Sequence, residues 1–487
     1  MQRNASYALR PLPVRMKMRI IKKAFVGQIA VLLMMGMLLL SSCTDSYLTQ
    51  ESGGDESTVM QPQGNMSPSV SPDASDVILP PEACTPEVLS EQLSSVCTVL
   101  PCTPEFLEFC NTLTGSEVFY RALAWQLSQN GYSDDLWLTV TGRSYRALDA
   151  LYHADEQPDN VKIMNDAAGG VANLAFVGDI NLDDNQFCMQ NATALGKTPS
   201  ECIDSTLISA LNSADIAYAN SEFCFSIRGY PLITKRPNYR SHPDNVVLYK
   251  TLGLDIVNLA NNHVFDYSAN ALTDTFTTLT DAGITYVGAG ENDTEAGTVR
   301  YFVVNGLKIA YIAASRAEVY QRTPSAEPEQ SGVLAAYDPT VFCARIAEAK
   351  QNADYVIACI HAGNEKGTAL QDEQIALARA CVDNGADLVV GTHPQKAQGI
   401  EYHNGVPIVY SLGNFWYGGE NTNCILLSAT LGANGVTLSI LPCQFIDGIV
   451  YNRAKTVEGA KVIQEINKGS VNAVVDYFGS VKQTEPK

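Results

Sequence analysis

Apolar runs alternate with amphipathic stretches along the chain from Val171 onward. The runs are apolar almost without interruption and span 171–180, 214–222, 253–263, 283–290, 353–365 and 385–394. Continuous apolar runs predict strands that are buried on both faces. The stretch 371–387 has helical periodicity and ends near Gly385, which predicts an amphipathic helix.

Two Asn-Gly pairs, at 305–306 and 404–405, interrupt further apolar segments. This dipeptide adopts the left-handed backbone of two-residue turns, so each pair predicts a β-hairpin. Buried strands separated by helices, with added antiparallel hairpins, place the chain in the α/β class.

The region before these strands has a different pattern. Helical periodicity covers 81–165, where Thr-Pro-Glu and Ser-Glu sequences are typical of helix starts. We interpret it as a small helical accessory region. The preceding segment, 44–80, is rich in Ser, Pro, Gly, Gln and Asp and buries too little apolar surface to fold, which predicts a disordered tether.

The first 43 residues have the pattern of an export signal. Seven Lys and Arg residues without an acid precede an apolar stretch from Ala24 to Leu40, and small residues then lead to Cys43. The ending resembles the lipobox of bacterial lipoproteins, which implies lipidation at Cys43 and anchoring to the outer face of the bacterial cell membrane. The alternative is a transmembrane anchor, for which seventeen residues are short.

Charge and cysteines limit the possible partners. The chain has 487 residues and a net charge of −20, so its overall field does not attract nucleic acid, and an anionic substrate needs local cations. Twelve cysteines besides Cys43 lie in a chain expected to be exported. Four of them lie close together without zinc-site spacing, and the sequence does not choose between their pairings: Cys84, Cys97, Cys102 and Cys110.

Metal-binding side chains follow five of the predicted strands. Three of the six histidines are among them, in the set Asp179, Glu222, Asn262, His263, His361 and His393. Ligand sites in open α/β folds form beyond the carboxyl ends of strands. Carboxylate, amide and imidazole ligands suit a hard or borderline divalent cation, Mn²⁺, Zn²⁺, Fe²⁺ or Mg²⁺. Each residue alone is more typical of a cap or turn, but their joint recurrence predicts a metal site.

The order of these motifs resembles the bacterial CapA family, the poly-γ-glutamate capsule synthesis proteins. The resemblance covers about 171–417 and is carried by FVGDINL, NSE, LANNHVFDYS, HAGNE, GADLVVGTHP and YSLGNF. That family in turn resembles the calcineurin-like metallophosphatases. The resemblance implies a two-sheet sandwich flanked by helices (α/β/β/α) over 170–420, with 421–487 completing the domain.

The resemblance also implies roles. Asp179 and Glu222 would be carboxylate ligands of one or two divalent metal ions, and His361 and His393 would complete the metal shell. Asn262 and His263 match the Asn-His pair of the phosphatases, in which Asn binds metal and His is catalytic. Asp266 would orient His263 through a hydrogen bond.

Three positions depart from the family pattern. Gln395 stands where the family has the second His of His-Pro-His, and Ala362 follows His361 where the family has Trp. Asn181 stands in the place of the His in the Asp-x-His motif of the phosphatases. A single metal, or binding without turnover, therefore becomes more plausible.

Cations near the Glu222 motif are candidates for holding an anionic substrate. Arg228, Lys235, Arg236 and Arg240 lie in one segment of an otherwise acidic chain, and Arg forks match carboxylate oxygens. A solvated loop is the alternative. Four residues complete our substrate-binding set: Arg236, Arg240, Glu365 and Gln395.

These features lead to three hypotheses. The first is a lipid-anchored protein for synthesis, export or anchoring of an anionic capsule polymer such as poly-γ-glutamate, working with capsule-synthesis membrane subunits through a metal-dependent hydrolase or transferase site. The second is a non-catalytic scaffold that grips polymer or partner. The third is an extracytoplasmic metallophosphoesterase unrelated to capsule, because a fold does not specify a substrate.

Overall fold

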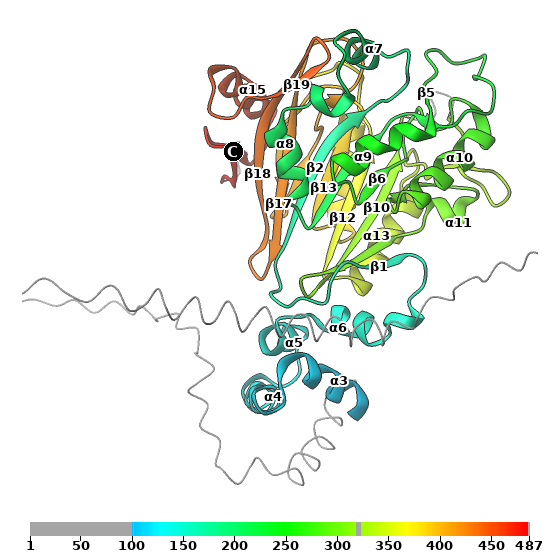
Figure 1. Ribbon diagram of the computed structural model, residues 1–487. Helices are drawn as coiled ribbons and strands as arrows, with labels where there is room; N and C mark the ends of the chain where they lie inside the picture. Colours follow the sequence, from blue (N-terminus) through cyan, green and yellow to red (C-terminus); the bar gives the residue numbers. More distant parts are fainter. Residues whose placement is uncertain (1–99, 101, 318–322, 486–487) are drawn as a thin grey trace, which may run out of the picture. The chain divides into compact units, whose positions relative to one another are not determined.

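The described part of the chain is built around two β-sheets (Figure 1). The structure is a computed structural model that describes residues 100, 102–317 and 323–485, all within the unit Val77–Lys487. Within these ranges one sheet has seven strands, in the order β1 (Val161–Ile163), β9 (Arg300–Val304), β10 (Leu307–Ser315), β12 (Tyr355–His361), β13 (Leu388–Thr392), β15 (Val406–Val409) and β14 (Ile400–His403).

The second sheet is larger. Its main path runs β20 (Ala473–Val475), β21 (Ser480–Gln483), β18 (Gly435–Ile446), β17 (Thr422–Gly432), β2 (Ala172–Ile180), β3 (Ile216–Ser221), β6 (Ile256–Asn258) and β7 (Thr285–Val287). Off this path, β16 (Asn414–Trp416) pairs with β2 and β19 (Ile449–Asn452) with β18. The parallel strands β2, β3 and β6 coincide with three of the predicted buried runs.

Side chains of successive strand residues point to opposite faces and so build two cores. Tyr311 of β10 faces the other sheet, where its ring centroid lies 6.4 Å from that of Phe176 on β2. Its neighbour Ile312 points the other way, into a core shared with α13 (Thr340–Asn352) and α14 (Asp372–Asp383). The seven-stranded sheet is thus covered by a sheet on one face and by helices on the other.

Further helices cover the outer face of the larger sheet (Figure 1). They are α8 (Ser205–Asn212), α9 (Val247–Thr251) and α10 (Ser268–Asp281), and each adds one or two buried leucines to the main core. Other helices lie at the rims: α7 (Phe187–Ala194), α11 (Asp293–Ala296) and α15 (Val457–Lys468). The layers are helix, sheet, sheet and helix, so the predicted fold class is confirmed.

Both predicted hairpins are confirmed. Asn305 and Gly306 join β9 to β10 with φ values of 49° and 83°, and Asn404 and Gly405 join β14 to β15 with 52° and 82°. Positive φ at both central residues is the backbone of a type I′ turn, whose twist matches that of paired strands. Short two-stranded pairs lie outside the sheets: β4 (Cys224–Phe225) with β5 (Arg240–Ser241), and β8 (Ala289–Gly290) with β11 (Gly332–Val333).

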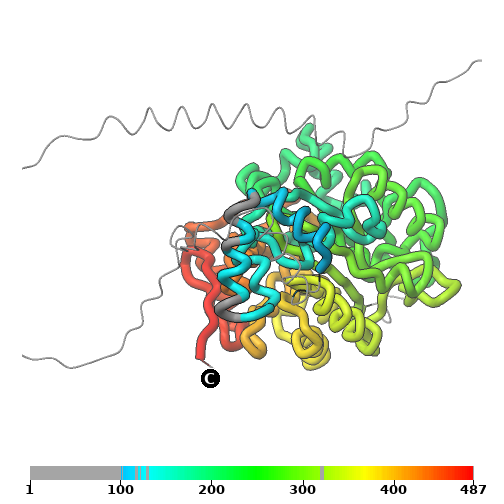
Figure 2. The backbone as a smooth tube through the Cα atoms, turned by 90° about the horizontal axis from the view of Figure 1, so that it is seen from below, coloured from blue at the N-terminus to red at the C-terminus, as the bar shows by residue number. Residues whose placement is uncertain are grey.

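The N-terminal helices form a core of their own around Phe106, Phe119 and Trp137. They are α3 (Pro104–Thr114), α4 (Ser116–Asn130), α5 (Asp134–Thr141) and α6 (Tyr145–Tyr152), shown in blue and cyan in Figure 2. Helix α3 begins as predicted for a Thr-Pro sequence, because Thr103 Oγ1 accepts a hydrogen bond from the Phe106 N–H (3.3 Å). The helical prediction to 165 is wrong at its end, since β1 (Val161–Ile163) joins the seven-stranded sheet beside β9.

The helical region contacts the amino-terminal ends of the seven-stranded sheet. Ser144 donates its backbone N–H to Gly306 O (2.7 Å) and its hydroxyl to Asp354 just before β12 (2.5 Å). Parallel strands carry their ligand-binding residues at the opposite, carboxyl ends. The helical region therefore lies at the other end of the sheet from the predicted site.

Several predictions concern residues outside the described ranges. The export signal at 1–43 with Cys43, the tether at 44–80, and both Cys84 and Cys97 lie there. Within the described ranges, no helix is both long and apolar enough to cross a bilayer. Cys110 is a buried free thiol.

Candidate metal centre

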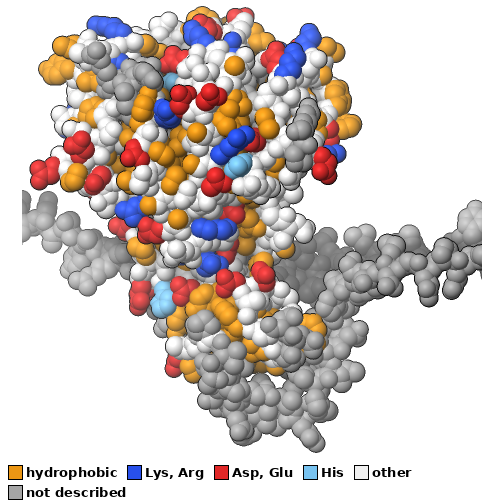
Figure 3. Space-filling model, turned by 180° about the vertical axis from the view of Figure 1, so that it is seen from behind, with side chains coloured by type: hydrophobic (Ala, Val, Ile, Leu, Met, Phe, Trp, Pro, Cys, Tyr) orange, Lys and Arg blue, Asp and Glu red, His pale blue; other side chains and the backbone are white. Residues whose placement is uncertain are grey.

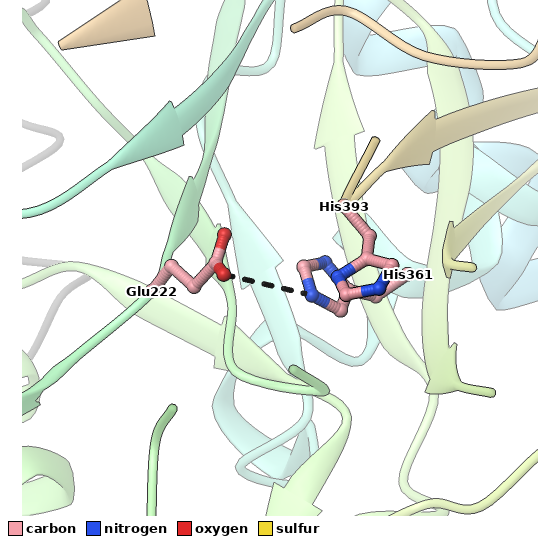
Figure 4. Close-up of side chains that lie close together, drawn as sticks. All are labelled: Glu222, His361 and His393. Atoms are coloured by element: carbon pink, nitrogen blue, oxygen red, sulfur yellow. Dashed lines mark ion pairs between the residues drawn. The ribbon is translucent and has the colours of Figure 1, made fainter. Parts of the chain in front are cut away.

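The predicted ligands converge between the two sheets. Glu222 follows β3 of the larger sheet, whereas His361 ends β12 and His393 follows β13 of the seven-stranded sheet. Figure 4 shows the carboxylate of Glu222 facing the two imidazoles across this gap. One potential ligand atom from each of the three residues lies within 4.8 Å of the others.

His361 lies at the middle of this group. Its Nε2 is 3.9 Å from Glu222 Oε1 and 2.7 Å from Asn262 Oδ1, and its ring centroid is 4.6 Å from that of His393. Thr392 Oγ1 lies 2.9 Å from the other ring nitrogen, Nδ1, and so fixes the ring orientation. Two ligands of one ion, each about 2.0–2.2 Å from it, lie at most about 4.4 Å apart, so the distances from His361 Nε2 to Glu222 Oε1 and to Asn262 Oδ1 suit a shared cation.

Asp179 joins the group through an asparagine that our sequence analysis did not identify. Asn220 donates to Asp179 Oδ1 (2.7 Å) and to Glu222 Oε2 (3.2 Å). Asn220 and Glu222 are two residues apart, which places both side chains on one face of the extended chain. That spacing is the sequence signal that would have identified Asn220.

We call Asp179, Glu222, Asn262, His361 and His393 the ligand cluster. All five are buried, with at most 5% of the side chain exposed. Three of their buried polar atoms have no hydrogen-bond partner in the protein: Asp179 Oδ2, Asn262 Nδ2 and His393 Nδ1. Such orphaned atoms are rare in protein interiors and point to a group outside the chain.

Burial controls the protonation of the ligand cluster. It raises the pKa of Asp179 to about 7 and that of Glu222 well above its usual value, and the neighbouring carboxylate adds to the shift of Glu222. Burial lowers the pKa of His393 to about 3 and that of His361 well below its usual value. The imidazoles are therefore neutral and able to ligate, and a cation would favour the ionised carboxylates. The residues fit a divalent cation.

A second group lies beside the ligand cluster, and we call His263, Asp266 and Lys235 the His263 triad. His263 Nδ1 lies 2.7 Å from Asp266 Oδ2, which also accepts the backbone N–H of Tyr239 (2.8 Å). Lys235 Nζ donates to Asp266 Oδ1 and to the backbone carbonyl of Asn262. The sequence predicted the Asp266 contact.

The predicted substrate-binding residues lie farther out. Lys235, interpreted as one cation of an anion-binding loop, is instead 5% exposed and paired with Asp266. Arg236 is exposed, whereas Arg240 lies 4.2 Å over the Tyr267 ring and donates to Arg228 O (3.0 Å). Arg228 itself is paired with Asp274. The structure does not gather these cations around one point.

Glu365 and Gln395 lie on loops next to the ligand cluster. Glu365 is exposed, and its charge contributes to the raised pKa of both Asp179 and Glu222. Gln395 is half-buried with φ of 63°, and its backbone carbonyl accepts from Thr422 Oγ1 (3.1 Å).

The side chain of Asn181 forms hydrogen bonds with the backbone. Its Nδ2 donates to Glu222 O (3.2 Å) and its Oδ1 accepts from Asp183 N–H (2.9 Å). Both amide atoms are engaged, so Asn181 is not in a position to replace the histidine of the phosphatase pattern as a ligand.

Comparison with known proteins identifies proteins that are similar to this chain. The chain is 36% identical over 189 residues to the PGA biosynthesis protein CapA of Bacillus subtilis, covering 39% of this chain and 49% of that protein. It is 32% identical over 249 residues to the capsule biosynthesis protein CapA of Bacillus anthracis, covering 50% and 60%. It thus spans about half the length of these curated relatives. The NAD nucleotidase of Haemophilus influenzae is a structural match with a TM-score of 0.35 and 13% identity, covering 62% of this chain and 63% of that one.

A family model describes the same region as the motifs. It is that of the bacterial capsule synthesis protein PGA_cap, and it matches residues 173–418, which include the whole ligand cluster and the His263 triad. This match covers half of the 487 residues. The chain belongs to the bacterial capsule synthesis protein PGA_cap family.

Proposed function

We propose that this protein is a metal-dependent hydrolase or transferase that acts in the synthesis, export or anchoring of an anionic capsule polymer such as poly-γ-glutamate. The observation that carries the proposal is the convergence of Glu222, His361 and His393 from two sheets on one buried point. Family membership supports the polymer as substrate, and the ligand cluster supports hydrolytic or transfer chemistry.

The ligand cluster would hold a divalent cation through Asp179, Glu222, Asn262, His361 and His393. When bound, the cation would lower the pKa of a coordinated water and polarise a carbonyl or phosphoryl oxygen. Thr392 and Asn220 keep the ligands in place by the hydrogen bonds described above.

His263 is the group that would handle a proton. Burial and the nearby Lys235 charge lower its pKa, and Asp266 opposes them. A neutral ring whose Nδ1 hydrogen bonds to Asp266 leaves Nε2 to accept a proton from the nucleophile or to return it to the leaving group. Lys235 and Tyr239 hold Asp266 and thereby the orientation of His263.

The location is also a proposal. We infer export and lipidation at Cys43 from the N-terminal pattern, with the helical region and the tether linking the domain to the outer face of the cell membrane. Capsule-synthesis membrane subunits are the expected partners. On the face seen in Figure 3, acidic and basic side chains of the described residues are interspersed, which favours local recognition of an anionic polymer over a broad basic surface.

The test uses the full chain in detergent. Bound metal is measured by mass spectrometry, and hydrolysis of γ-glutamyl peptides and phosphoesters is measured with added Mn²⁺ or Zn²⁺. We expect metal binding together with γ-glutamyl cleavage, and loss of both in His361→Ala. Metal binding with phosphoester cleavage alone would replace the polymer by a phosphoester substrate and favour the third hypothesis.

A non-catalytic scaffold is the second candidate, favoured by the engagement of Asn181 with the backbone. A site without a histidine ligand at position 181 would hold fewer metal ions and could bind the polymer without cleaving it. Capsule formation in cells that carry His263→Ala distinguishes the two: a scaffold would still support it, whereas an enzyme that depends on His263 would not.

A further inference from the structure

A pocket of about 250 Å³ opens beside the ligand cluster and is not used by the proposed mechanism. It lies between the end of β10, the loop after β12 and the start of α14, with His393 in its wall. Pockets for whole small-molecule ligands occupy about 300–1,000 Å³, so this one suits a single unit of a larger ligand. Its other main lining residues are Arg316, Gly363, Glu373 and Gln374.

Two features of the pocket attract an anion. Arg316 directly follows β10. Its backbone N–H donates to His361 O (2.9 Å), which fixes its backbone beside the ligand cluster, and its guanidinium lies 4.3 Å over the Tyr337 ring. Helix α14 begins here, and its N-cap residue Gln371 makes no side-chain capping bond. The first-turn N–H groups of a helix and an arginine fork both favour carboxylate oxygens.

The loop after β12 is shaped around Gln374. Gly363 has φ of 114°, and a Cβ at this position would lie 2.9 Å from Gln374 Oε1, so the close approach requires glycine. Gln374 donates to Gln398 Oε1 (2.9 Å) and Tyr410 O (3.2 Å), which holds it rigidly, while its own Oε1 has no partner in the protein. The pocket is therefore a preformed surface.

The charge balance selects the kind of anion. Arg316 is opposed by the exposed carboxylate of Glu373 at the same pocket, so the lining carries no net positive charge apart from the helix end. This balance disfavours a phosphate dianion and suits a single carboxylate next to an N–H group, which the partnerless Gln374 Oε1 would accept. Amino-acid units joined through amide bonds have this combination.

We propose that this pocket, the Arg316 pocket, binds the carboxylate of one amide-linked amino-acid unit of the substrate and thereby presents the adjacent bond to the ligand cluster. Arg316 would hold the carboxylate together with the amino-terminal end of α14. The identity of the ligand rests on the proposed function, whereas the binding site rests on the pocket alone.

The test is calorimetric titration of the full-length protein with a γ-linked diglutamate peptide. We expect Arg316→Gln to weaken binding about tenfold to 100-fold, because a charge-assisted hydrogen bond contributes that much. Arg316→Lys keeps the charge but loses the two parallel N–H groups of the guanidinium. Its affinity for the peptide should fall between those of the wild type and Arg316→Gln. Arg345→Gln is the matched control on α13, where Arg345 pairs with Glu348, and this variant should bind as the wild type does. A peptide with carboxamides in place of its carboxylates should bind as weakly to the wild type as the acid does to Arg316→Gln.

Several results would overturn the inference: no peptide binding by the wild type, equal binding by Arg316→Gln, loss confined to Arg345→Gln, or competition by inorganic phosphate as strong as by the peptide. Circular dichroism checks that the variants fold. Metal content is measured on the same samples, so that a metal-free protein with Arg316-dependent binding would contradict the metal chemistry and leave the Arg316 pocket standing.

Discussion

The ligand cluster and the His263 triad lie side by side and are equally buried, yet their polar atoms are satisfied differently. Both oxygens of Asp266 have partners within the chain, in Lys235, His263 and the Tyr239 N–H. In the ligand cluster, by contrast, Asp179 and His393 each have a buried atom without a partner. A complete network stabilises its own geometry, whereas an incomplete one costs free energy until something else binds.

Because of this contrast, the two groups should depend differently on a bound metal ion. The His263 triad should be preformed and insensitive to metal, because its charges compensate one another. The ligand cluster should gain stability from a cation, because its carboxylates repel each other and are desolvated.

The largest expected effect comes from breaking the complete network. Lys235→Met removes the cation and leaves Asp266 as an uncompensated buried charge, which should lower the free energy of unfolding by about 3–5 kcal/mol. Urea denaturation measures it. Arg228→Met is the control, since it breaks the ion pair of an exposed arginine and should change the free energy of unfolding far less. Equal small losses in both variants would show that the triad is not the tightly coupled unit described here.

Removing a ligand should affect metal rather than the fold. Changes to residues that merely orient ligands lower metal affinity about tenfold to 100-fold, and His361→Ala should exceed that range because it deletes a ligand. The affinity is measured by competition with a fluorescent chelator. His403→Ala changes a histidine on the hairpin β14–β15 and should bind metal normally. Retention of metal by His361→Ala would show that the metal binds elsewhere in the protein.

The ligand cluster should also show a pH signature in metal-free protein. The pKa of Asp179 is raised to about 7, so the folded state holds a proton that the unfolded state releases near its usual pKa of 3.8. This contribution favours the fold at low pH and is lost as pH rises from about 4 to about 7, with a slope of at most about 1.4 kcal/mol per pH unit. The unfolding free energy of the wild type relative to Asp179→Asn should fall over that window. Saturating Mn²⁺ should reverse the trend, and a flat difference without metal would contradict it.

Sequence alone predicted the parts of the site that depend on local pattern. Glu222, His361 and His393 are predictable because buried strands appear in the sequence as apolar runs, and the ends of these runs mark the ends of the strands. The hairpins at 305–306 and 404–405 were equally local. The burial of a side chain could not be predicted where it depends on a partner far away in the sequence. Lys235 resembled its exposed neighbours in the segment because its partner, Asp266, lies 31 residues away in sequence.

Other misses have the same cause. Asn220 lies inside a strand, where only its two-residue spacing from Glu222 marks it, and its contact with Asp179 depends on the pairing of β2 with β3. Strand β1 is three residues long, too short for a periodic pattern, and is defined by its pairing with β9. Arg316 was passed over because the Arg316 pocket depends on α14, which follows much later in the chain.

The smallest expected effect on metal binding concerns Asn181, which holds the backbone carbonyl of Glu222. Restoring the phosphatase histidine with Asn181→His tests whether a missing imidazole limits the site to fewer ions. We expect the number of bound ions to stay that of the wild type, because this position holds Glu222 O and the Asp183 N–H rather than facing an ion. A larger ring in a fully buried position should instead cost about 1–3 kcal/mol of stability. Asn181→Leu keeps the size, offers no ligand atom and serves as the matched control. A second tightly bound ion in Asn181→His, measured by mass spectrometry, would show that this backbone contact gives way to a ligand and that the ligand cluster extends farther than the five residues assigned to it.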